Sequence, residues 1–165
     1  MSKLLILCRH GKSDYPDDAK DFDRTLTQRG LDDSKLIGRL FKKMAIVPGC
    51  VLASPAIRAS VTSITMMQEL GFTDQIQWEK SLYEEGLENA LKLTSNISNE
   101  FNTAMIIGHN PTMEEIAHTF LNMKSVINIP TCGIVAIEFY VEDWQSINST
   151  NAILKWFIRP KLIRD

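Results

Sequence analysis

Three short, mainly apolar runs recur along the chain, and each is followed by a polar or amphipathic stretch. They are "KLLILC" at residues 3–8, "CVLAS" at 50–54 and "TAMIIG" at 103–108. Runs of this length and continuity are typical of strands covered on both faces, as in a parallel sheet packed between helices. We therefore predict three buried strands at these ranges.

Further strands are expected in the later part of the chain. The stretches 132–141, "CGIVAIEFYV", and 152–158, "AILKWFI", flank a polar loop of residues 142–151. We expect these two stretches to pair as an antiparallel hairpin, which would make the sheet mixed. Residues 76–83, "IQWEKSLY", have the composition of an edge strand or an extended segment.

The segments between the strands carry helical periodicity. Thr27 is a suitable N-cap, and Pro48 and Gly49 would end the helix that follows it. Apolar residues of this helix recur with the i, i+3, i+4, i+7 spacing of one face, at Ile37, Leu40, Phe41 and Met44. Another helix is expected over residues 87–98.

Two more helices are predicted from a capping residue followed by proline at the first helical position. In the first, Ser54 is the cap, Pro55 follows it and Gly71 ends the helix; its apolar stripe is Ile57, Val61 and Ile64. In the second, Asn110 is the cap and Pro111 follows it; its inward residues are Met113, Ile116 and Phe120.

Strands that alternate with helices predict an α/β fold, here a three-layer sandwich with a mainly parallel mixed sheet flanked by helices. The length of 165 residues suits one compact domain, and 44% hydrophobic with 23% charged residues is typical of a soluble globular protein. Because no repeat, low-complexity tract or linker marks a boundary, we expect a single domain over residues 1–165.

The net charge and the cysteine content limit which classes of partner and which cellular compartment we expect. The formal net charge of -2 argues against a general nucleic-acid or anionic-membrane binder. The apolar run at residues 4–8 is too short for a membrane span and has no small-residue cleavage site after it. The cysteines, Cys8, Cys50 and Cys132, have no paired spacing, which is typical of reduced thiols in a cytoplasmic protein and not of a disulfide framework or metal site.

Residues 7–13, "LCRHGKS", hold candidate chemistry with more than one interpretation. The letters GKS at 11–13 match the end of a nucleotide-binding P-loop, but that motif needs a glycine at the position of Ile6. A cysteine phosphatase with Cys8 as nucleophile would need an arginine where Asp14 stands. The sequence therefore argues against both alternatives.

Histidines follow two of the predicted strands. His10, next to Arg9, follows the first strand, and His109 follows the strand at 103–108. Since ligands bind beyond the carboxyl ends of strands in open α/β sheets, we expect these side chains to form a site there. Arg58 lies in the first turns of a predicted helix, where N–H groups and the helix dipole favour an anion. Together these donors suit a phosphoryl group.

With these residues in place, the chain resembles the histidine phosphatase superfamily, and within it the small phosphohistidine phosphatase branch. The family signature is Arg-His-Gly after the first strand, here residues 9–11. The ordered motifs of the resemblance cover nearly the whole chain and are "CRHGKS", "DFDRTLTQRG", "VLASPAIRASVTS", "LYEEGLENAL", "MIIGHNPTMEEIA", "IPTCGIVAIEF" and "LKWFIRPKLI".

The resemblance implies a phosphoglycerate mutase-like fold and a phosphatase that works through a phosphohistidine intermediate. His10 would attack phosphorus as the neutral imidazole, and water would then hydrolyse the covalent intermediate. Arg9, Arg58 and His109 would hold the equatorial oxygens, as catalytic and substrate-binding residues. Because such fixed donors stabilise the transferred group, the reaction would need no metal and no cofactor.

Four more residues are candidates for binding the phosphoryl group. Gly11 would let the backbone approach the substrate closely, and Asn110 follows His109 in the Gly-His-Asn-Pro motif. Ser13 would either donate to a phosphate oxygen or cap a turn. Arg24, which the resemblance also brings towards the phosphate, would otherwise form a salt bridge with neighbouring aspartates.

The general acid is the remaining catalytic assignment. Mutase-like relatives use a glutamate after Leu-x, and Leu82-Tyr83-Glu84 matches that spacing, which makes Glu84 the candidate. A carboxylate in a polar loop is otherwise simply solvated, and an imidazole leaving group could take its proton from water.

The expected openness of the site bears on the substrate. Residues 70–103 leave room for only a strand, a loop and one helix, so no sizeable cap is expected. An open site favours phosphohistidine in a protein as the substrate; the alternatives are a small phosphomonoester, for a phosphatase or a mutase, and a catalytically silent phosphate-binding module. The five aspartates of residues 14–23 would steer a basic partner or are merely solvated. We expect a monomer without nucleic-acid or membrane partners.

Overall fold

The structure is a computed structural model that describes residues 2–15 and 20–164. Two of the aspartates of the predicted acidic loop, Asp17 and Asp18, lie outside the described residues. No helix in the described ranges combines the length and the apolar character needed to cross a membrane.

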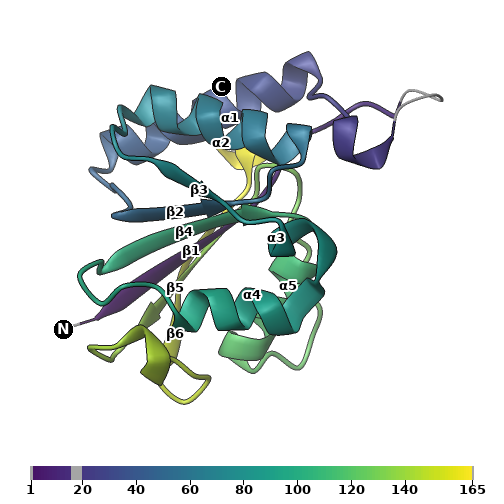
Figure 1. Ribbon diagram of the computed structural model, residues 1–165. Helices are drawn as coiled ribbons and strands as arrows, with labels where there is room; N and C mark the ends of the chain where they lie inside the picture. Colours follow the sequence, from purple (N-terminus) through teal and green to yellow (C-terminus); the bar gives the residue numbers. More distant parts are fainter. Residues whose placement is uncertain (1, 16–19, 165) are drawn as a thin grey trace.

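The described residues form a six-stranded sheet in the order β3-β2-β4-β1-β5-β6 (Figure 1). Its strands are β1 (Lys3–Arg9), β2 (Cys50–Ala53), β3 (Ile76–Trp78), β4 (Thr103–Gly108), β5 (Ile134–Phe139) and β6 (Ala152–Ile158). The first four strands are parallel, whereas β5 pairs antiparallel with β1 and β6 pairs antiparallel with β5. The predicted mixed, mainly parallel sheet and its C-terminal hairpin are confirmed.

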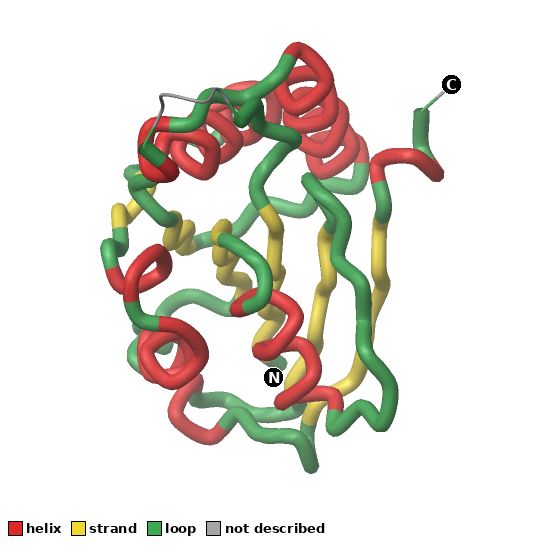
Figure 2. The backbone as a smooth tube through the Cα atoms, turned by 90° about the vertical axis from the view of Figure 1, so that its right-hand side faces the viewer, coloured by secondary structure: helices red, strands yellow, loops and turns green. Residues whose placement is uncertain are grey.

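Helices cover both faces of this sheet, with α1 and α2 on one side and α4 and α5 on the other (Figures 1 and 2). The helices are α1 (Gln28–Lys43), α2 (Ile57–Leu70), α3 (Ser81–Glu84), α4 (Gly86–Ser95) and α5 (Thr112–Leu121). Three short 3-10 turns complete the described elements, η1 (Asp21–Asp23), η2 (Trp144–Ser146) and η3 (Pro160–Leu162). This is the predicted three-layer arrangement.

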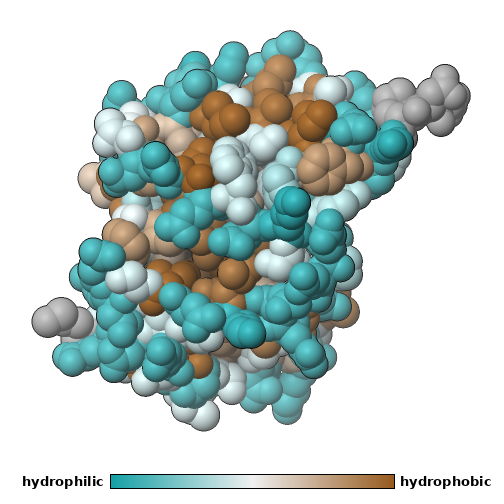
Figure 3. Space-filling view, in the orientation of Figure 1, coloured by the Kyte–Doolittle hydropathy of each residue, from teal (hydrophilic) through white to brown (hydrophobic). Residues whose placement is uncertain are grey.

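The core consists of two apolar layers, one on each face of the sheet. Side chains alternate between the faces along a strand, so Leu5 and Leu7 pack with α4 and α5 while Ile6 and Cys8 pack with α1 and α2. All four are fully buried. On the face seen in Figure 3, hydrophilic side chains dominate the rim and hydrophobic patches lie between them. Because the central strands are buried on both faces, they hold the residues that follow their carboxyl ends in fixed positions.

Helix α2 begins later than predicted. Its first residue is Ile57, and Ala56 occupies the N-cap, so Pro55 lies before the helix. Ser54 was predicted as the cap, but its Oγ accepts a hydrogen bond from the backbone N–H of Ala56 at 3.3 Å, within the turn that precedes the helix. The predicted end is confirmed, because Gly71 terminates α2 with a φ of 82°.

The predicted apolar stripe of α2 is also wrong, since Ile64 is 41% exposed. The buried face instead carries small and flexible side chains, Ala59, Thr62, Ser63, Met66 and Met67. The reason is the close approach of α1, because a β-carbon on Gly38 would clash with the carbonyl oxygen of Met66. The hydroxyls of Thr62 and Ser63 donate to carbonyls one turn earlier, which permits their burial.

Other element boundaries differ from the predictions by a few residues. Thr27 is confirmed as the N-cap of α1, with its hydroxyl accepting from the N–H of Gly30 at 3.1 Å, but α1 ends at Lys43 and Met44 is 44% exposed. The helix predicted over 87–98 spans Gly86–Ser95. Of the stretch 76–83, three residues form a strand and the last three belong to α3.

Helix α5 starts at Thr112, and Pro111 occupies the N-cap position that was predicted for Asn110. The peptide bond between Asn110 and Pro111 is cis. The side chain of Asn110 does not cap the helix, since its Nδ2 donates to Glu114 and to the carbonyl of Ile129. The inward face of α5 is confirmed, because Met113, Ile116 and Phe120 are buried.

Candidate active site

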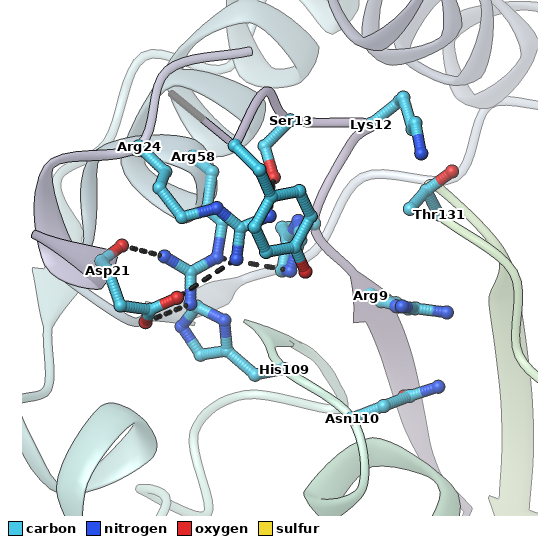
Figure 4. A pocket seen from close by; sticks show the side chains of 11 residues that line it. Arg9, Lys12, Ser13, Asp21, Arg24, Arg58, His109, Asn110 and Thr131 are labelled. Carbon is cyan, nitrogen blue, oxygen red and sulfur yellow. Dashed lines mark hydrogen bonds and ion pairs between the residues drawn. The ribbon is translucent and has the colours of Figure 1, made fainter. Parts of the chain in front are cut away.

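A cavity of about 340 Å³ lies at the carboxyl ends of β1 and β4. Its lining is mostly polar and comes from segments far apart in the sequence (Figure 4). The lining residues are Arg9, His10, Lys12, Ser13, Tyr15, Asp21, Arg24, Arg58, His109, Asn110 and Thr131. Of the predicted site residues, Arg9, His10, Ser13, Arg24, Arg58, His109 and Asn110 line this cavity.

The two histidines meet because their strands are parallel neighbours. Arg9, the last residue of β1, is in register with Gly108, the last residue of β4, so the next residue of each strand leaves the sheet at the same edge. The ring centroids of His10 and His109 are 5.0 Å apart, with their planes at 56°. The expectation that they share one sheet edge is met by this geometry.

The backbone fixes the proton on the His10 ring. Its Nδ1 lies 2.7 Å from the carbonyl oxygen of Gly11, and a carbonyl only accepts, so Nδ1 carries the hydrogen. Nε2 is then unprotonated and accepts a hydrogen bond from Nε of Arg58 at 3.3 Å. Nε2 therefore carries the lone pair that a nucleophilic histidine needs, and in this structure that lone pair is held by Arg58.

The environment keeps both rings neutral. Burial, with smaller contributions from His109, Arg58 and Arg9, lowers the pKa of His10 to about 3, although the hydrogen bond to Gly11 opposes this shift. Burial and then the charge of Arg58 lower the pKa of His109 to about 4. At neutral pH, therefore, neither imidazole carries a charge, and His10 is an unprotonated base.

Gly11 has a different role from the predicted one, which was to let the backbone approach the substrate closely. Its N–H donates to the hydroxyl of Thr62 at 2.9 Å and its carbonyl accepts from His10, so its backbone polar groups are used within the protein. A β-carbon at this position would lie 2.9 Å from the carbonyl oxygen of Gly30. Glycine is required here by the packing of the loop against the start of α1, and it holds the His10 ring in place.

The second histidine retains an unused polar atom. His109 Nε2 lies 2.8 Å from the hydroxyl of Ser54, whereas His109 Nδ1 is buried and has no partner in the described residues. Arg9 is similar, because Nη1 donates to the carbonyl of Ile129 at 3.0 Å while the buried Nε has no described partner. Buried polar atoms without partners are uncommon and point to a polar ligand in the cavity.

A loop between β1 and α1 contributes a further arginine. Arg24 is buried, and it donates to the carbonyl of Asp14 at 2.9 Å, to the hydroxyl of Ser13 at 2.6 Å and to Oδ1 of Asp21 at 2.9 Å. The salt bridge with an aspartate of the loop is thus present, and Arg24 also lines the cavity; its binding to a phosphoryl group stays a prediction. Ser13 accepts from Arg24 and also lines the cavity.

The structure places Glu84, the predicted general acid, outside the cavity. It is exposed at the end of α3 and is not among the lining residues. Its neighbour Tyr83 turns towards the site instead, with its hydroxyl donating to Oδ2 of Asp21 at 3.0 Å and its ring centroid 5.5 Å from that of His109.

Sequence reasoning missed Asp21 as a member of the site. Among the described residues, it provides the one carboxylate that lines the cavity. The available signal was the spacing in "DFDR", which puts Asp21 three residues before Arg24 and allows their salt bridge. Lys12, Tyr15 and Thr131 were also not predicted as lining residues.

Asn110 lines the cavity, and its side-chain amide also forms hydrogen bonds to two neighbouring segments of the chain. Its Nδ2 donates to Glu114 Oε1 at 2.6 Å and to the carbonyl of Ile129 at 3.1 Å, while its Oδ1 is buried without a described partner.

Among the described residues, no group of three or more His, Cys, Asp or Glu side chains is arranged to hold a metal ion. The arrangement thus offers a neutral nucleophile, several cations and N–H donors.

Comparison with known proteins gives this geometry a family. Residues 5–101 match the description of the histidine phosphatase superfamily (branch 1). In sequence, the chain is 27% identical over 165 residues to the protein ML1117 of Mycobacterium leprae, with 93% of this chain and 99% of that protein covered.

Solved structures show the same fold. The protein histidine phosphatase SixA, solved with tungstate, superposes with a TM-score of 0.83 and 20% identity, covering 98% of this chain and 99% of that one. A mycobacterial glucosyl-3-phosphoglycerate phosphatase, Rv2419c, superposes with a TM-score of 0.66 and 12% identity, covering 94% and 98%. The matched region spans more than half of the chain and contains His10 and Arg58. The protein therefore belongs to the histidine phosphatase superfamily.

Proposed function

We propose that the protein is a phosphatase that removes the phosphoryl group from phosphohistidine in a protein, through a covalent intermediate on His10. The observation that carries this proposal is the state of the His10 ring. Its Nδ1–H is held by the Gly11 carbonyl, its Nε2 is unprotonated beside Arg58, and burial keeps it neutral. A neutral imidazole with its lone pair at a cationic cavity is a nucleophile for phosphorus.

The reaction proceeds in two displacements. In the first, Nε2 of His10 bonds to phosphorus as the bond from phosphorus to the leaving nitrogen breaks, and the leaving imidazole takes a proton from water. The hydrogen bond from Nδ1 to the Gly11 carbonyl stabilises the positive charge that develops on the His10 ring. In the second, the oxygen of water bonds to phosphorus as the bond from phosphorus to Nε2 of His10 breaks. Inorganic phosphate leaves, the proton lost by the attacking water neutralises the hydroxide left by the first step, and neutral His10 is restored.

Cationic side chains stabilise the transferred group in place of a metal ion. Arg9, Lys12, Arg24 and Arg58 line the cavity. Nε of Arg9 and Nδ1 of His109, which have no partner within the described ranges, add capacity for hydrogen bonds. Such fixed donors suit a phosphoryl group, whose charge is spread over its equatorial oxygens. The reaction is accordingly proposed to need neither metal nor cofactor.

A protein-borne substrate is supported by the surroundings of the cavity and by its relatives. Between β3 and β4 the described chain contains only the short helices α3 and α4, so this connection carries no cap domain. SixA, which shares the fold, is a protein histidine phosphatase and was solved with tungstate, a tetrahedral oxyanion like phosphate. The same chemistry is proposed for the cavity described here.

The test compares wild type with His10→Gln on two substrates, a histidine-phosphorylated protein and p-nitrophenyl phosphate, with EDTA present. Wild type is expected to turn over both substrates in EDTA, because its nucleophile needs no metal. It is expected to prefer the phosphoprotein, because its cavity is open. His10→Gln is expected to lose at least about a thousandfold in kcat/KM. The matched control is His118→Gln, an exposed histidine on α5, which should retain wild-type turnover.

The intermediate is checked by mass spectrometry after a quench at alkaline pH, where phosphohistidine survives. Wild type should gain the mass of one phosphoryl group on the peptide that contains His10, and His118→Gln should gain it too. Turnover that persists in His10→Gln would disprove the covalent mechanism. A preference for small phosphomonoesters would show that these, and not a phosphoprotein, are the substrate. Oxyanion binding without any turnover would indicate a phosphate-binding module.

A further inference from the structure

The carboxylate of Asp21 lies among the cations that are proposed to hold the phosphoryl group. Its Oδ2 accepts from Nη2 of Arg58 at 2.9 Å, its Oδ1 accepts from Nη1 of Arg24 at 2.9 Å, and its backbone carbonyl accepts from Nη1 of Arg58 at 2.5 Å (Figure 4). Tyr83 adds a hydrogen bond from its hydroxyl to Oδ2 at 3.0 Å. One carboxylate thus bridges two guanidinium groups and occupies donors that an oxyanion would use.

Asp21 is connected to the nucleophile His10 through one side chain, that of Arg58. Arg58 donates with Nε to Nε2 of His10 and with both terminal nitrogens to Asp21. When a phosphoryl group approaches His10, the hydrogen bond from Arg58 to Nε2 must break, because that lone pair forms the new bond. Arg58 can then turn its donors to the phosphoryl oxygens only by loosening its hold on Asp21.

The charge on Asp21 is permanent at neutral pH. Partial burial would raise the pKa of this carboxyl, but hydrogen bonds from Arg24, Tyr83 and Arg58 outweigh it and lower the pKa to about 2. Asp21 therefore has no proton to give and does not take the general-acid role that was considered for Glu84. Its effect on the site is that of a fixed negative charge held by Arg24 and Arg58, two of the four cationic side chains that line the cavity.

From this geometry we infer that Asp21 is a specificity-determining residue, whose carboxylate competes with tetrahedral oxyanions for Arg24 and Arg58. A phosphate dianion that enters alone must displace this internal anion and gains only its own contacts. A phosphoryl group carried by a protein gains further contacts outside the cavity, which offset the same cost. Asp21 thereby weakens binding of free phosphate and small phosphomonoesters relative to a phosphoprotein. The inference deepens the proposed function and rests on it for the identity of the substrate.

A purely structural role for Asp21, as a tie between the loop and α2, makes a different prediction. Removal of a tie would disorder Arg24 and Arg58 and would weaken oxyanion binding. Removal of a competing charge would strengthen it. The sign of the change in oxyanion affinity therefore separates the two roles.

The experiment measures binding of tungstate and of inorganic phosphate by calorimetry at low ionic strength, for wild type, Asp21→Asn and Asp21→Ala. Asp23→Asn is the matched control, because it removes the same charge from η1 at a residue that does not line the cavity. Both Asp21 variants are expected to bind tungstate about tenfold more tightly, as one charge next to a dianion is removed. Asp23→Asn should bind as wild type does.

Turnover supplies the second readout. In the Asp21 variants, KM for p-nitrophenyl phosphate should fall about tenfold while KM for the phosphoprotein changes less, so that the preference for the phosphoprotein shrinks. Unchanged or weaker tungstate binding in Asp21→Asn, with a wild-type melting temperature, would overturn the inference, as would absence of tungstate binding in every form. Tighter tungstate binding without turnover of any substrate would support the role of Asp21 and disprove the proposed phosphatase.

Discussion

At the scale of single residues, the site depends on histidines that are kept neutral inside the fold. His10 is 7% exposed and sits beside a second histidine and two arginines, so protonation would place another charge in an already cationic cavity. Neutrality serves the nucleophile, since a protonated Nε2 has no lone pair to offer. The same burial carries a cost in stability when the solution becomes acidic.

We predict that the free energy of unfolding falls as the pH drops below about 6.5, the ordinary pKa of histidine. In the folded protein the pKa of His10 is about 3 and that of His109 about 4, so between these values and 6.5 the unfolded chain binds more protons. Stability from this source is complete above pH 6.5 and declines below it. For His10 alone the loss at pH 5 is about 2 kcal/mol.

Urea unfolding at pH 7 and at pH 5 measures this effect, with His10→Gln as the comparison. Glutamine does not titrate, so the variant should lose less stability between the two pH values than wild type does. Equal losses in both proteins would show that His10 is not buried as a neutral ring.

At the scale of elements, helix α1 makes two close contacts through glycine. A β-carbon on Gly38 would clash with the carbonyl oxygen of Met66 in α2, and one on Gly30 would clash with the carbonyl oxygen of Lys12, in the loop that leaves His10. The first contact sets the distance between two helices, and the second sets the position of the loop at the cavity. One helix therefore connects the packing of the outer layer to the site.

Alanine at each glycine is expected to separate these two functions. Gly38→Ala should lower the free energy of unfolding by about 1–3 kcal/mol, through overpacking between helices, and should leave kcat unchanged. Gly30→Ala should cause a similar loss of stability and should also reduce kcat, because Lys12 and the following loop must move. Thermal melting and turnover of p-nitrophenyl phosphate test both; loss of turnover in Gly38→Ala would contradict this division.

The order of the strands and of the four longer helices could be predicted from the sequence, because each buried strand is a continuous apolar run. The short helix α3 lies in a stretch that was predicted as extended. The first residue of a helix could not be predicted equally well. Ser54 and Pro55 have the composition of a helix start, yet Ser54 lies against His109 and the helix begins only at Ile57. A residue recruited to the site departs from the local capping rule, and the local pattern does not reveal this.

The candidate site was most directly predictable where it follows strand ends, although Arg24 and Arg58, which lie elsewhere, were also predicted and line the cavity. His10 and His109 leave neighbouring parallel strands, and their proximity follows from that topology. Asp21 belongs to a polar loop, and local spacing allows its salt bridge with Arg24. Its salt bridge with Arg58 depends on tertiary contacts and could not be derived from spacing. Glu84 had the expected spacing, but the turn of α3 presents Tyr83 to the site and leaves Glu84 in solvent.

At the scale of the whole molecule, the C-terminal segment is fastened to the first helix by charge. Arg164, just after η3, donates through Nε to Oδ1 of Asp33 at 2.9 Å, and Asp33 on α1 is only 2% exposed. A buried carboxylate that loses its partner costs more than an exposed one, because it cannot recover full hydration. The pair therefore joins the last described turn to the layer of α1 and α2.

Arg164→Met is expected to lower the free energy of unfolding by about 1–3 kcal/mol, because it leaves Asp33 buried with Arg29, at 3.7 Å, as its remaining ion-pair partner among the described residues. Turnover should not change, since neither residue lines the cavity. Chemical denaturation measures the loss. Arg159→Met serves as a control for charge removal in the same segment, and equal stability of the two variants would contradict the importance of the pair.

The hairpin at the end of the sheet has a consequence for the protein's behaviour at high concentration. Strand β6 is an outer strand, and Ile153 and Leu154 on it are 49% and 44% exposed. Such a strand is a template on which another chain can add. However, Lys155 is an extra residue in the pairing with β5, and its ammonium group binds Glu138 at 2.6 Å. An incoming strand would lose register at this bulge and would have to strip water from the ion pair, so the sheet resists growth into aggregates at its apolar edge.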